Sequence, residues 1–218
     1  MAALAATGIE EGVWLRADRQ TGGRGRQGRA WVSPPGNLYA STLVRPRPSD
    51  PSPASLALVA AVALEEAVGA YLPGRVRIKW PNDLLIDGAK LSGILLEGAS
   101  GAVVIGIGVN LAYHPADTDR PATSLAAQGV AVTPEDFVET LADAFARWVQ
   151  KWRGEGIETV RRRWVERAHP VGTPLTARLA DGSSADGLFD GLDGDGALIL
   201  RLADGTRRVI HAGDVFLL

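Results

Sequence analysis

The chain contains no cysteine among its 218 residues. Disulfide bonds, thiolate metal sites and a cysteine nucleophile are therefore excluded. Only three histidines occur, His114, His169 and His211, and they do not have the H-x-x-x-H or H-E-x-x-H spacing that is typical of a metal hydrolase. Ser100 lies in the sequence GASG rather than in G-x-S-x-G, so the sequence does not indicate a serine hydrolase either.

An excess of positive charge and a long apolar run are also lacking. The 23 Lys and Arg residues are balanced by 25 Asp and Glu residues, and the net charge of −2 disfavours a broad contact with nucleic-acid phosphates. No basic segment precedes an apolar run at the start of the chain, as it would in a signal peptide. No stretch reaches the ~18 uninterrupted apolar residues that span a bilayer. We therefore expect a cytoplasmic protein that binds neither nucleic acid nor membrane.

Two patterns of sequence follow one another along the chain. Up to residue 169, apolar strand-like segments alternate with long helical segments. From residue 171, short strand-like segments are separated by Asp-Gly turns every ~8–12 residues, which is typical of a small β-barrel. We predict two domains, residues 1–169 and residues 170–218, and we expect the second to be an SH3-like barrel.

Periodicity and end signals predict the elements of the first domain. Strands are expected at residues 12–17, 37–44, 75–80, 84–86, 90–97 and 102–111, and helices at residues 54–72, 134–153 and 157–168. Ser52 is predicted to cap the first helix and Thr133 the second. In residues 75–80, alternation places Val76 and Ile78 on one face of the strand and Lys79 on the other. Residues 114–132 are predicted to form a loop.

The most unusual segment is residues 17–31, ADRQTGGRGRQGRAW, which we call the basic loop. Its arginines are Arg19, Arg24, Arg26 and Arg29, and its glycines are Gly22, Gly23, Gly25 and Gly28. Glycine allows close backbone approach to a ligand, and arginine offers planar cationic forks to phosphate or carboxylate. The G-x-G-x-x-G spacing does not indicate a dinucleotide site here, because WVSPPG follows and prolines prevent the required helix. Taken alone, the segment is compatible with a solvated basic turn and with a loop that folds over an anion.

Two other segments place ligand-type residues at strand ends, where binding sites gather. The first is residues 79–83 (KWPND) with the nearby residues 90–93 (KLSG), and the second is residues 106–110 (GIGVN). Taken singly, each is also compatible with a structural role: a turn, a solvated hairpin lysine, or a glycine strand packed against a helix.

Taken together, GRGRQGRAW, KWPNDL, KLSGIL and GVN, in this order, resemble the catalytic domain of the biotin protein ligases. The C-terminal sequence AGDVFLL also resembles that family, so the resemblance covers residues 12–218. It implies an α/β (α+β) fold, with a mixed-sheet catalytic domain followed by an SH3-like barrel. It also implies a monofunctional ligase, because the sequence has no room for the N-terminal winged helix of the family members that act as repressors.

The implied reaction has two steps and uses ATP, biotin and Mg²⁺. Biotin and ATP give biotinyl-5′-AMP and pyrophosphate, and biotin then passes to a lysine of the biotin carboxyl carrier protein of acetyl-CoA carboxylase or a related carboxylase. The implied catalytic residues are Lys90 and Arg26, cations where two anions meet. The implied biotin contacts are Gln20, Gly23, Arg24, Gly25, Arg26, Tyr39, Lys90 and Gly93. The implied nucleotide contacts are Arg26, Trp31, Asn82, Asp83 and Asn110, and Asp83 is also an implied auxiliary ligand of Mg²⁺, which the phosphates mainly hold.

The sequence departs from the family in one respect and leaves alternatives open. Family members usually carry a Ser-Thr-Asn motif before the basic loop, whereas residues 1–11 contain only Thr7, so we expect either that the sequence starts late or that biotin is bound with fewer contacts. A lipoate-ligase-like acyltransferase of the same fold is one alternative, and a non-catalytic biotin- or adenylate-binding protein is another. The presence of Arg26 and Lys90 disfavours the second. A homodimer also occurs in the family.

Overall fold

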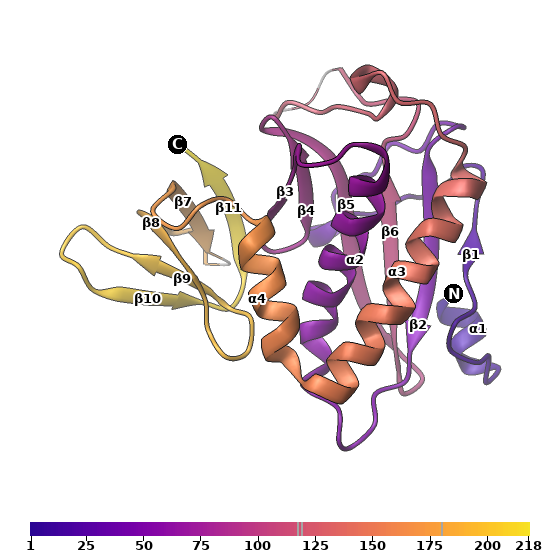
Figure 1. Ribbon diagram of the computed structural model, residues 1–218, viewed down its shortest axis with the longest axis horizontal. Helices are drawn as coiled ribbons and strands as arrows, with labels where there is room; N and C mark the ends of the chain where they lie inside the picture. Colours follow the sequence, from indigo (N-terminus) through magenta and orange to yellow (C-terminus); the bar gives the residue numbers. More distant parts are fainter. Residues whose placement is uncertain (117, 119, 180) are drawn as a thin grey trace.

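The computed structural model describes residues 1–116, 118, 120–179 and 181–218, and it contains two antiparallel sheets (Figure 1). The first sheet has the strand order β1-β2-β6-β5-β4-β3. Its strands are β1 (Leu15–Arg16), β2 (Leu38–Val44), β3 (Val76–Lys79), β4 (Asp83–Ile86), β5 (Ala89–Ala99) and β6 (Ala102–Val109). All neighbouring strands in this sheet run antiparallel. Parallel pairing occurs, among the described residues, as the isolated bridges Ile78↔Ala168 and Lys90↔Ala122.

Three helices cover one face of the first sheet, α2 (Leu56–Tyr71), α3 (Pro134–Glu155) and α4 (Ile157–Arg167) (Figure 1). Helix α2 lies between the sheet and the other two helices, so it is apolar on nearly all sides. Its segment Pro53–Tyr71 is long and apolar enough to cross a bilayer, with a mean hydropathy of 1.5, but most of it is buried within this fold. We therefore describe α2 as the central core helix.

Helices α2 and α3 begin differently. At α3, Thr133 caps as predicted, because its hydroxyl accepts a hydrogen bond from the backbone N–H of Asp136 at 3.1 Å. The prediction for Ser52 was wrong: its side chain makes no capping bond, and its carbonyl oxygen instead accepts a hydrogen bond from Ser55 Oγ. The residues after Ser52 form a short 3₁₀ turn, η2 (Pro53–Ser55), before the α-helix starts.

The other face of the first sheet is lined by small side chains. Side chains alternate across a strand, so Leu38 and Ala40 of β2 enter the core under the helices while Tyr39 and Ser41 face the opposite side. On that side, glycines of β5 and β6 leave open space above the sheet. The short helix α1 (Ala2–Ala6) covers one end of this face and packs Ala5 against Leu43 and Val104.

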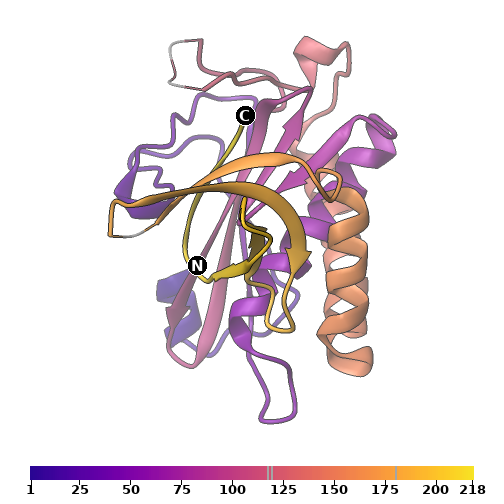
Figure 2. The same cartoon turned by 90° about the vertical axis from the view of Figure 1, so that its left-hand side faces the viewer.

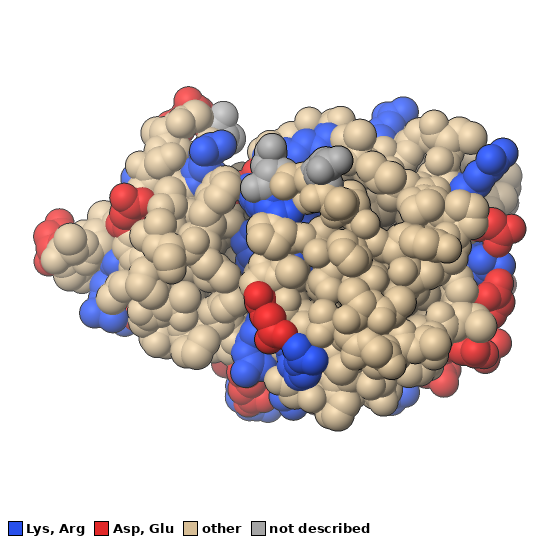
Figure 3. Space-filling model, turned by 90° about the horizontal axis from the view of Figure 1, so that it is seen from above, with Lys and Arg blue, Asp and Glu red and all other residues tan. Residues whose placement is uncertain are grey.

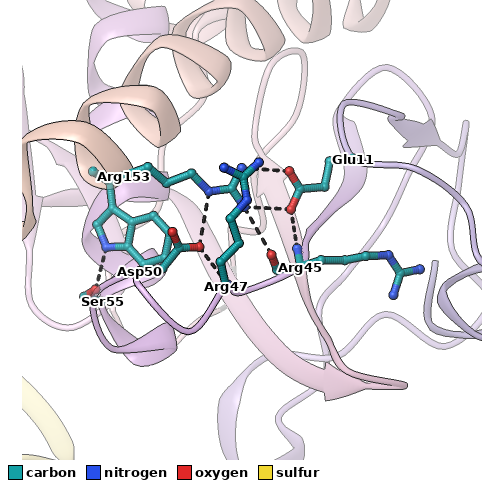
Figure 4. Close-up of polar contacts among 7 residues, drawn as sticks. Glu11, Arg45, Arg47, Asp50, Ser55 and Arg153 are labelled. Atoms are coloured by element: carbon teal, nitrogen blue, oxygen red, sulfur yellow. Dashed lines mark hydrogen bonds and ion pairs between the residues drawn. The ribbon is translucent and has the colours of Figure 1, made fainter.

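A partly buried ionic cluster fixes the segment after α1 (Figure 4). Arg153 of α3 donates two hydrogen bonds to Glu11, at 2.8 and 2.9 Å, and one to Asp50 at 3.2 Å. The backbone N–H of Arg45 also donates to Glu11. The hydrogen bond from Arg153 lowers the pKa of Glu11, and the same contact raises the pKa of Arg153. The cluster thus ties residues near the N-terminus to α3 and to the β2–α2 connection.

The second sheet has the strand order β10-β9-β8-β7-β11 and stands beside the first (Figures 1 and 2). Its strands are β7 (Pro174–Leu179), β8 (Ser184–Leu192), β9 (Leu198–Arg201), β10 (Arg207–Ile210) and β11 (Gly213–Leu217). Trp80 Nε1 donates to the carbonyl oxygen of Gly196 at 3.2 Å, and Trp164 of α4 packs edge-on against Phe189. These contacts hold the second sheet close to the turn after β3.

The predicted elements are largely confirmed, with ends displaced by a few residues. The strand predicted at residues 12–17 is reduced to the two residues of β1. The predicted loop at residues 114–132 contains a short 3₁₀ turn, η3 (Ala126–Gln128), and its residues 117 and 119 lie outside the described residues. Five antiparallel strands form where the barrel was predicted.

Candidate active site

A cavity of about 1030 Å³ lies between the open face of the first sheet, the basic loop and the edge of the second sheet. We call it the junction cavity. The predicted site residues that line it are Gln20, Arg24, Gly25, Arg26, Trp31, Tyr39, Asn82, Asp83, Lys90, Gly93 and Asn110. Figure 3 shows Lys and Arg side chains gathered where the part of the molecule that contains the second sheet meets the part that contains the first. The fold therefore brings together all of the predicted biotin- and nucleotide-contacting residues except Gly23.

The basic loop is folded as a compact hairpin. Gly25 N–H donates to the carbonyl oxygen of Arg29 at 2.7 Å, and Trp31 N–H donates to that of Gly23 at 3.0 Å. Gly23 does not line the cavity. A Cβ atom there would lie 2.5 Å from the carbonyl oxygen of Trp31 and 2.7 Å from Ser33 Oγ, so only glycine fits. The role of Gly23 in this structure is thus close backbone packing at the base of the loop.

Trp31 lies directly on Gly93 and Gly108, two glycines of β5 and β6 that we call the glycine floor of the cavity. A Cβ atom at Gly108 would be 2.7 Å from Cε2 of the indole, and one at Gly93 would be 3.4 Å from Cζ3. Lys90 Nζ lies 5.6 Å from the ring centroid, within the range of a cation–π contact. Within the described residues, the buried indole Nε1 has no hydrogen-bond partner, so it is available as a donor to a bound ligand.

Two lysines meet at the carboxylate of Asp83. Lys90 Nζ lies 2.6 Å from Oδ1 and Lys79 Nζ lies 3.9 Å from Oδ2. Burial lowers the pKa of Lys79 to about 8, an effect larger than the opposing attraction of Asp83. Lys90 is about one-third exposed and faces the cavity. The arrangement presents two ammonium groups at the cavity wall, where negative charge is stabilised.

The role of Asp83 as an auxiliary metal ligand stays a prediction. Both oxygens of its carboxylate face ammonium groups. Over residues 1–116, 118, 120–179 and 181–218, no group of three Asp, Glu, His or Cys side chains could hold a metal ion. A metal ion at Asp83 would therefore need ligands from outside these side chains, such as phosphate oxygens.

The two asparagines of the predicted nucleotide site make structural contacts as well. Asn82 donates from its side chain to the carbonyl oxygen of Ile94, which joins the β3–β4 turn to β5. Asn110 donates to the carbonyl oxygen of Thr123 at 3.0 Å and fixes the segment that follows β6. Each side-chain amide therefore shapes the cavity wall through at least one of its donors.

Gln20 and Tyr39 are likewise oriented by neighbours. Ser33 Oγ donates to the side-chain oxygen of Gln20 at 3.0 Å, and the hydroxyl of Tyr39 donates to the carbonyl oxygen of Pro34 at 2.7 Å. Burial raises the pKa of Tyr39, so its hydroxyl stays protonated. Both residues contribute to the cavity from beside the basic loop.

Strand β11 of the second sheet contributes an acidic residue that the sequence analysis did not identify. Asp214 accepts a hydrogen bond from Arg29, and its Oδ1 lies 3.8 Å from Nη1 of Arg26. The same Nη1 of Arg26 donates a hydrogen bond to the carbonyl oxygen of Gly213 at 3.2 Å. Burial acts to raise the pKa of Asp214, but the hydrogen bond and charge of Arg29, with the charges of Arg26 and Arg120, lower it overall. The basic loop is therefore anchored to the second sheet by ionic contacts.

Further cavity residues also escaped the sequence analysis, namely Lys79, Arg120, Arg178 and Phe216. Lys79 belongs to the KWPND segment, so its place in that segment could have identified it as a site residue. Phe216 lies in the C-terminal segment AGDVFLL, to which the sequence analysis assigned no site residue, and Arg120 and Arg178 lie outside every motif that it named. They reach the cavity only because the second sheet and the segment after β6 fold against it.

The sequence matches two family models and a series of known proteins. Residues 7–111 match the biotin/lipoate A/B protein ligase family, and residues 172–218 match the biotin protein ligase C-terminal domain. The biotin--[acetyl-CoA-carboxylase] ligase of Paracoccus denitrificans is 42% identical, with 97% of this chain and 92% of that protein covered. The chain belongs to the biotin protein ligase family.

Solved biotin protein ligases share the fold. The structure of the Aquifex aeolicus biotin protein ligase in complex with biotin and ATP superposes with a TM-score of 0.86 at 24% identity, covering 96% of this chain and 91% of that one. The Leishmania major biotin protein ligase in complex with biotinyl-5-AMP gives a TM-score of 0.67 at 29% identity, covering 97% and 93%. The predicted α+β fold with a C-terminal SH3-like β domain is thereby confirmed.

Proposed function

We propose that this chain is an ATP-dependent biotin protein ligase that uses the junction cavity for both steps of its reaction. In the first step, a carboxylate oxygen of biotin attacks the α-phosphorus of ATP, and pyrophosphate leaves. In the second, the amine of a carrier-protein lysine attacks the acyl carbon of biotinyl-5′-AMP, an amide forms, and AMP leaves. The observation that carries the proposal is the convergence of Arg26, Lys90 and Trp31 in one cavity of a chain from this family.

The proposed roles follow from charge and position. Two anions must meet in the first step, so cations are needed where they approach. Lys90, held by Asp83 at 2.6 Å, is proposed to attract the biotin carboxylate and the α-phosphate as a fixed charge, acting neither as base nor as nucleophile. Arg26 is proposed to share this task from the basic loop. Trp31 is proposed to shield the adenylate from water above the glycine floor.

The remaining site residues are proposed as binding contacts. Biotin would lie against Gln20, Arg24, Gly25, Tyr39 and Gly93, and the nucleotide would contact Asn82, Asp83 and Asn110. Mg²⁺ enters the proposal bound to the phosphates of ATP, since the described side chains provide no metal cluster.

The wider assignments are proposals as well. We propose a catalytic domain over residues 1–169 and an SH3-like barrel over residues 170–218 that closes the ATP side of the cavity. The proposed acceptor is a lysine of a biotin carboxyl carrier protein, and the proposed location is the cytoplasm. A homodimer stays a prediction from the family resemblance.

The test follows the mass of a biotin carboxyl carrier domain incubated with this protein, biotin and Mg·ATP. We expect a gain of one biotin with the parent protein and at least a 100-fold slower gain with Lys90→Ala, because removing one charge-stabilising contact in an active site costs ~10²–10³ in rate. Lys151→Ala is the matched control, since Lys151 is an exposed lysine of α3 outside the cavity. Carrier modification that proceeds equally in both variants would contradict the role of Lys90. Modification of the carrier with lipoate in place of biotin would favour the lipoate-ligase alternative.

A further inference from the structure

A pair of arginines shares one aromatic ring in the wall of the junction cavity. The guanidinium carbon of Arg120 lies 4.1 Å from the centroid of Phe216, and that of Arg178 lies 5.0 Å from the same centroid. All three residues line the cavity. Stacking on an aromatic ring orients a guanidinium group and leaves its N–H donors free for an anion.

The fold brings these arginines together from distant parts of the chain. The backbone of residues 121–123 pairs with Lys90, whose N–H donates to the carbonyl oxygen of Pro121 at 2.8 Å, so Arg120 is held beside the start of β5. Arg178 lies on β7 directly opposite Asp214 of β11, and Phe216 is two residues further along β11. The pair therefore spans the junction between the first and second sheets.

The cavity has an excess of positive charge. Among the described residues its cationic lining consists of Arg24, Arg26, Arg29, Lys79, Lys90, Arg120 and Arg178, and its acidic lining consists of Asp83, Glu97 and Asp214. Asp83 and Asp214 already pair with other cations of the site. Neither Arg120 nor Arg178 forms an ion pair with any carboxylate in the described part of the chain, so both retain their charge for a polyanion.

We propose that Arg120 and Arg178, stacked on Phe216, form the subsite for the β- and γ-phosphates of ATP and for the pyrophosphate that ATP releases. The inference rests on the proposed ligase function and extends it, because it assigns the leaving group to residues of the second sheet and of the segment after β6. Lys90 and Arg26 act at the α-phosphate, and the arginine pair acts beyond it. Bidentate guanidinium–phosphate contacts suit a group with several terminal oxygens.

The test measures the affinities of the full-length protein for pyrophosphate, ATP, AMP and biotin by calorimetric titration. We expect Arg120→Gln and Arg178→Gln each to weaken pyrophosphate and ATP binding about tenfold or more, and to leave AMP and biotin binding within about twofold of the parent. Arg178→Lys keeps the charge without the planar fork, so it should recover part of the loss. Arg208→Gln is the control, because Arg208 is an exposed arginine of β10 outside the cavity.

Two results would overturn the proposal. One is pyrophosphate affinity that is the same in both variants and the parent, and the other is a loss of AMP affinity as large as the loss of ATP affinity. Thermal unfolding midpoints equal to that of the parent establish that the variants are folded. The proposed function fails separately: a parent protein that binds pyrophosphate through these arginines but never biotinylates a carrier keeps the subsite and refutes the ligase assignment.

Discussion

The contact between Trp31 and Gly108 predicts that one added methyl group will release the basic loop. In Gly108→Ala, the new Cβ would lie 2.7 Å from Cε2 of the indole and 2.8 Å from Nε1, whereas ordinary contacts begin at 3.4 Å. The φ angle of Gly108 is not among the positive values that favour glycine, so alanine strains no backbone there. The indole must therefore retreat by about 0.7 Å or leave its site.

The size of the effect follows from how the loop is held. Overpacking by a methyl group costs about 1–3 kcal/mol, which corresponds to about a 5- to 150-fold shift between a seated and a released indole. Most residues of the first sheet are buried, whereas much of the basic loop is exposed. We therefore expect the added methyl group to displace the loop and to leave the sheet in place. We expect little change in the unfolding midpoint and a large change in the order of the loop.

Trypsin cleavage after the arginines of the loop measures that order in the ligand-free protein. Cleavage should be at least about fivefold faster in Gly108→Ala than in the parent. It should be unchanged in Gly106→Ala, where a Cβ lies 3.8 Å or more from every neighbouring atom. Trp31→Ala should also speed cleavage, and the double variant should be no faster than Trp31→Ala alone, because the two residues act through one contact. Equal cleavage in the two glycine variants, or additive effects in the double variant, would refute the reasoning.

Two further predictions use the titrating groups. Burial lowers the pKa of Lys79 to about 8, so this lysine loses its charge between pH 7 and pH 9. We expect ATP affinity to fall about tenfold over that pH range in the parent protein and to stay nearly constant in Lys79→Met. Calorimetric titrations that give the same pH dependence for the two proteins would contradict this. Glu11→Gln should lower the unfolding free energy by about 1–2 kcal/mol at pH 7, between the values for exposed and buried ion pairs, because Arg153 loses one of its two carboxylate partners. Since the pKa of Glu11 is lowered, its contribution is present above the ordinary value of 4.5 and is lost as pH falls through the folded pKa. The difference between parent and variant in urea melts should therefore shrink as the pH is lowered below 4.5, and a constant difference would show that the charge is not the cause.

Local pattern was sufficient to predict most of the fold. The alternation in β3 and the capping of α3 by Thr133 depend on residues that are neighbours in sequence, and both are found. The cap at Ser52 failed because the backbone N–H of Ser55 donates to the carbonyl oxygen of Ser52 in a 3₁₀ turn, and not to the Ser52 hydroxyl. Whether an N–H at a helix start bonds to a hydroxyl or to a carbonyl oxygen is decided by backbone geometry, which a sequence does not show.

The sequence predicted those residues of the candidate site that lie within its motifs. Lys90 and Arg26 stand in recognisable segments, and the fold places both at the junction cavity. Lys79 faces away from Val76 and Ile78 as alternation requires, but its burial could not be predicted, since the second sheet covers that end of β3. Asp214 and Arg178 escaped notice for the same reason: their relation to the basic loop exists only after the two sheets have docked.

The hydrogen bond from Arg26 to the carbonyl oxygen of Gly213 joins residues that are 187 positions apart in sequence. Chains are synthesised from the N-terminus, and domains generally fold as units in that order. The basic loop is therefore made long before the strand that anchors it, and contacts of such separation form late because their loop-closure entropy is high. A nascent chain can complete the first sheet while its cationic loop is still unanchored. The cavity is complete only when β11 has paired with β7 and brought Asp214 to the two arginines of the loop.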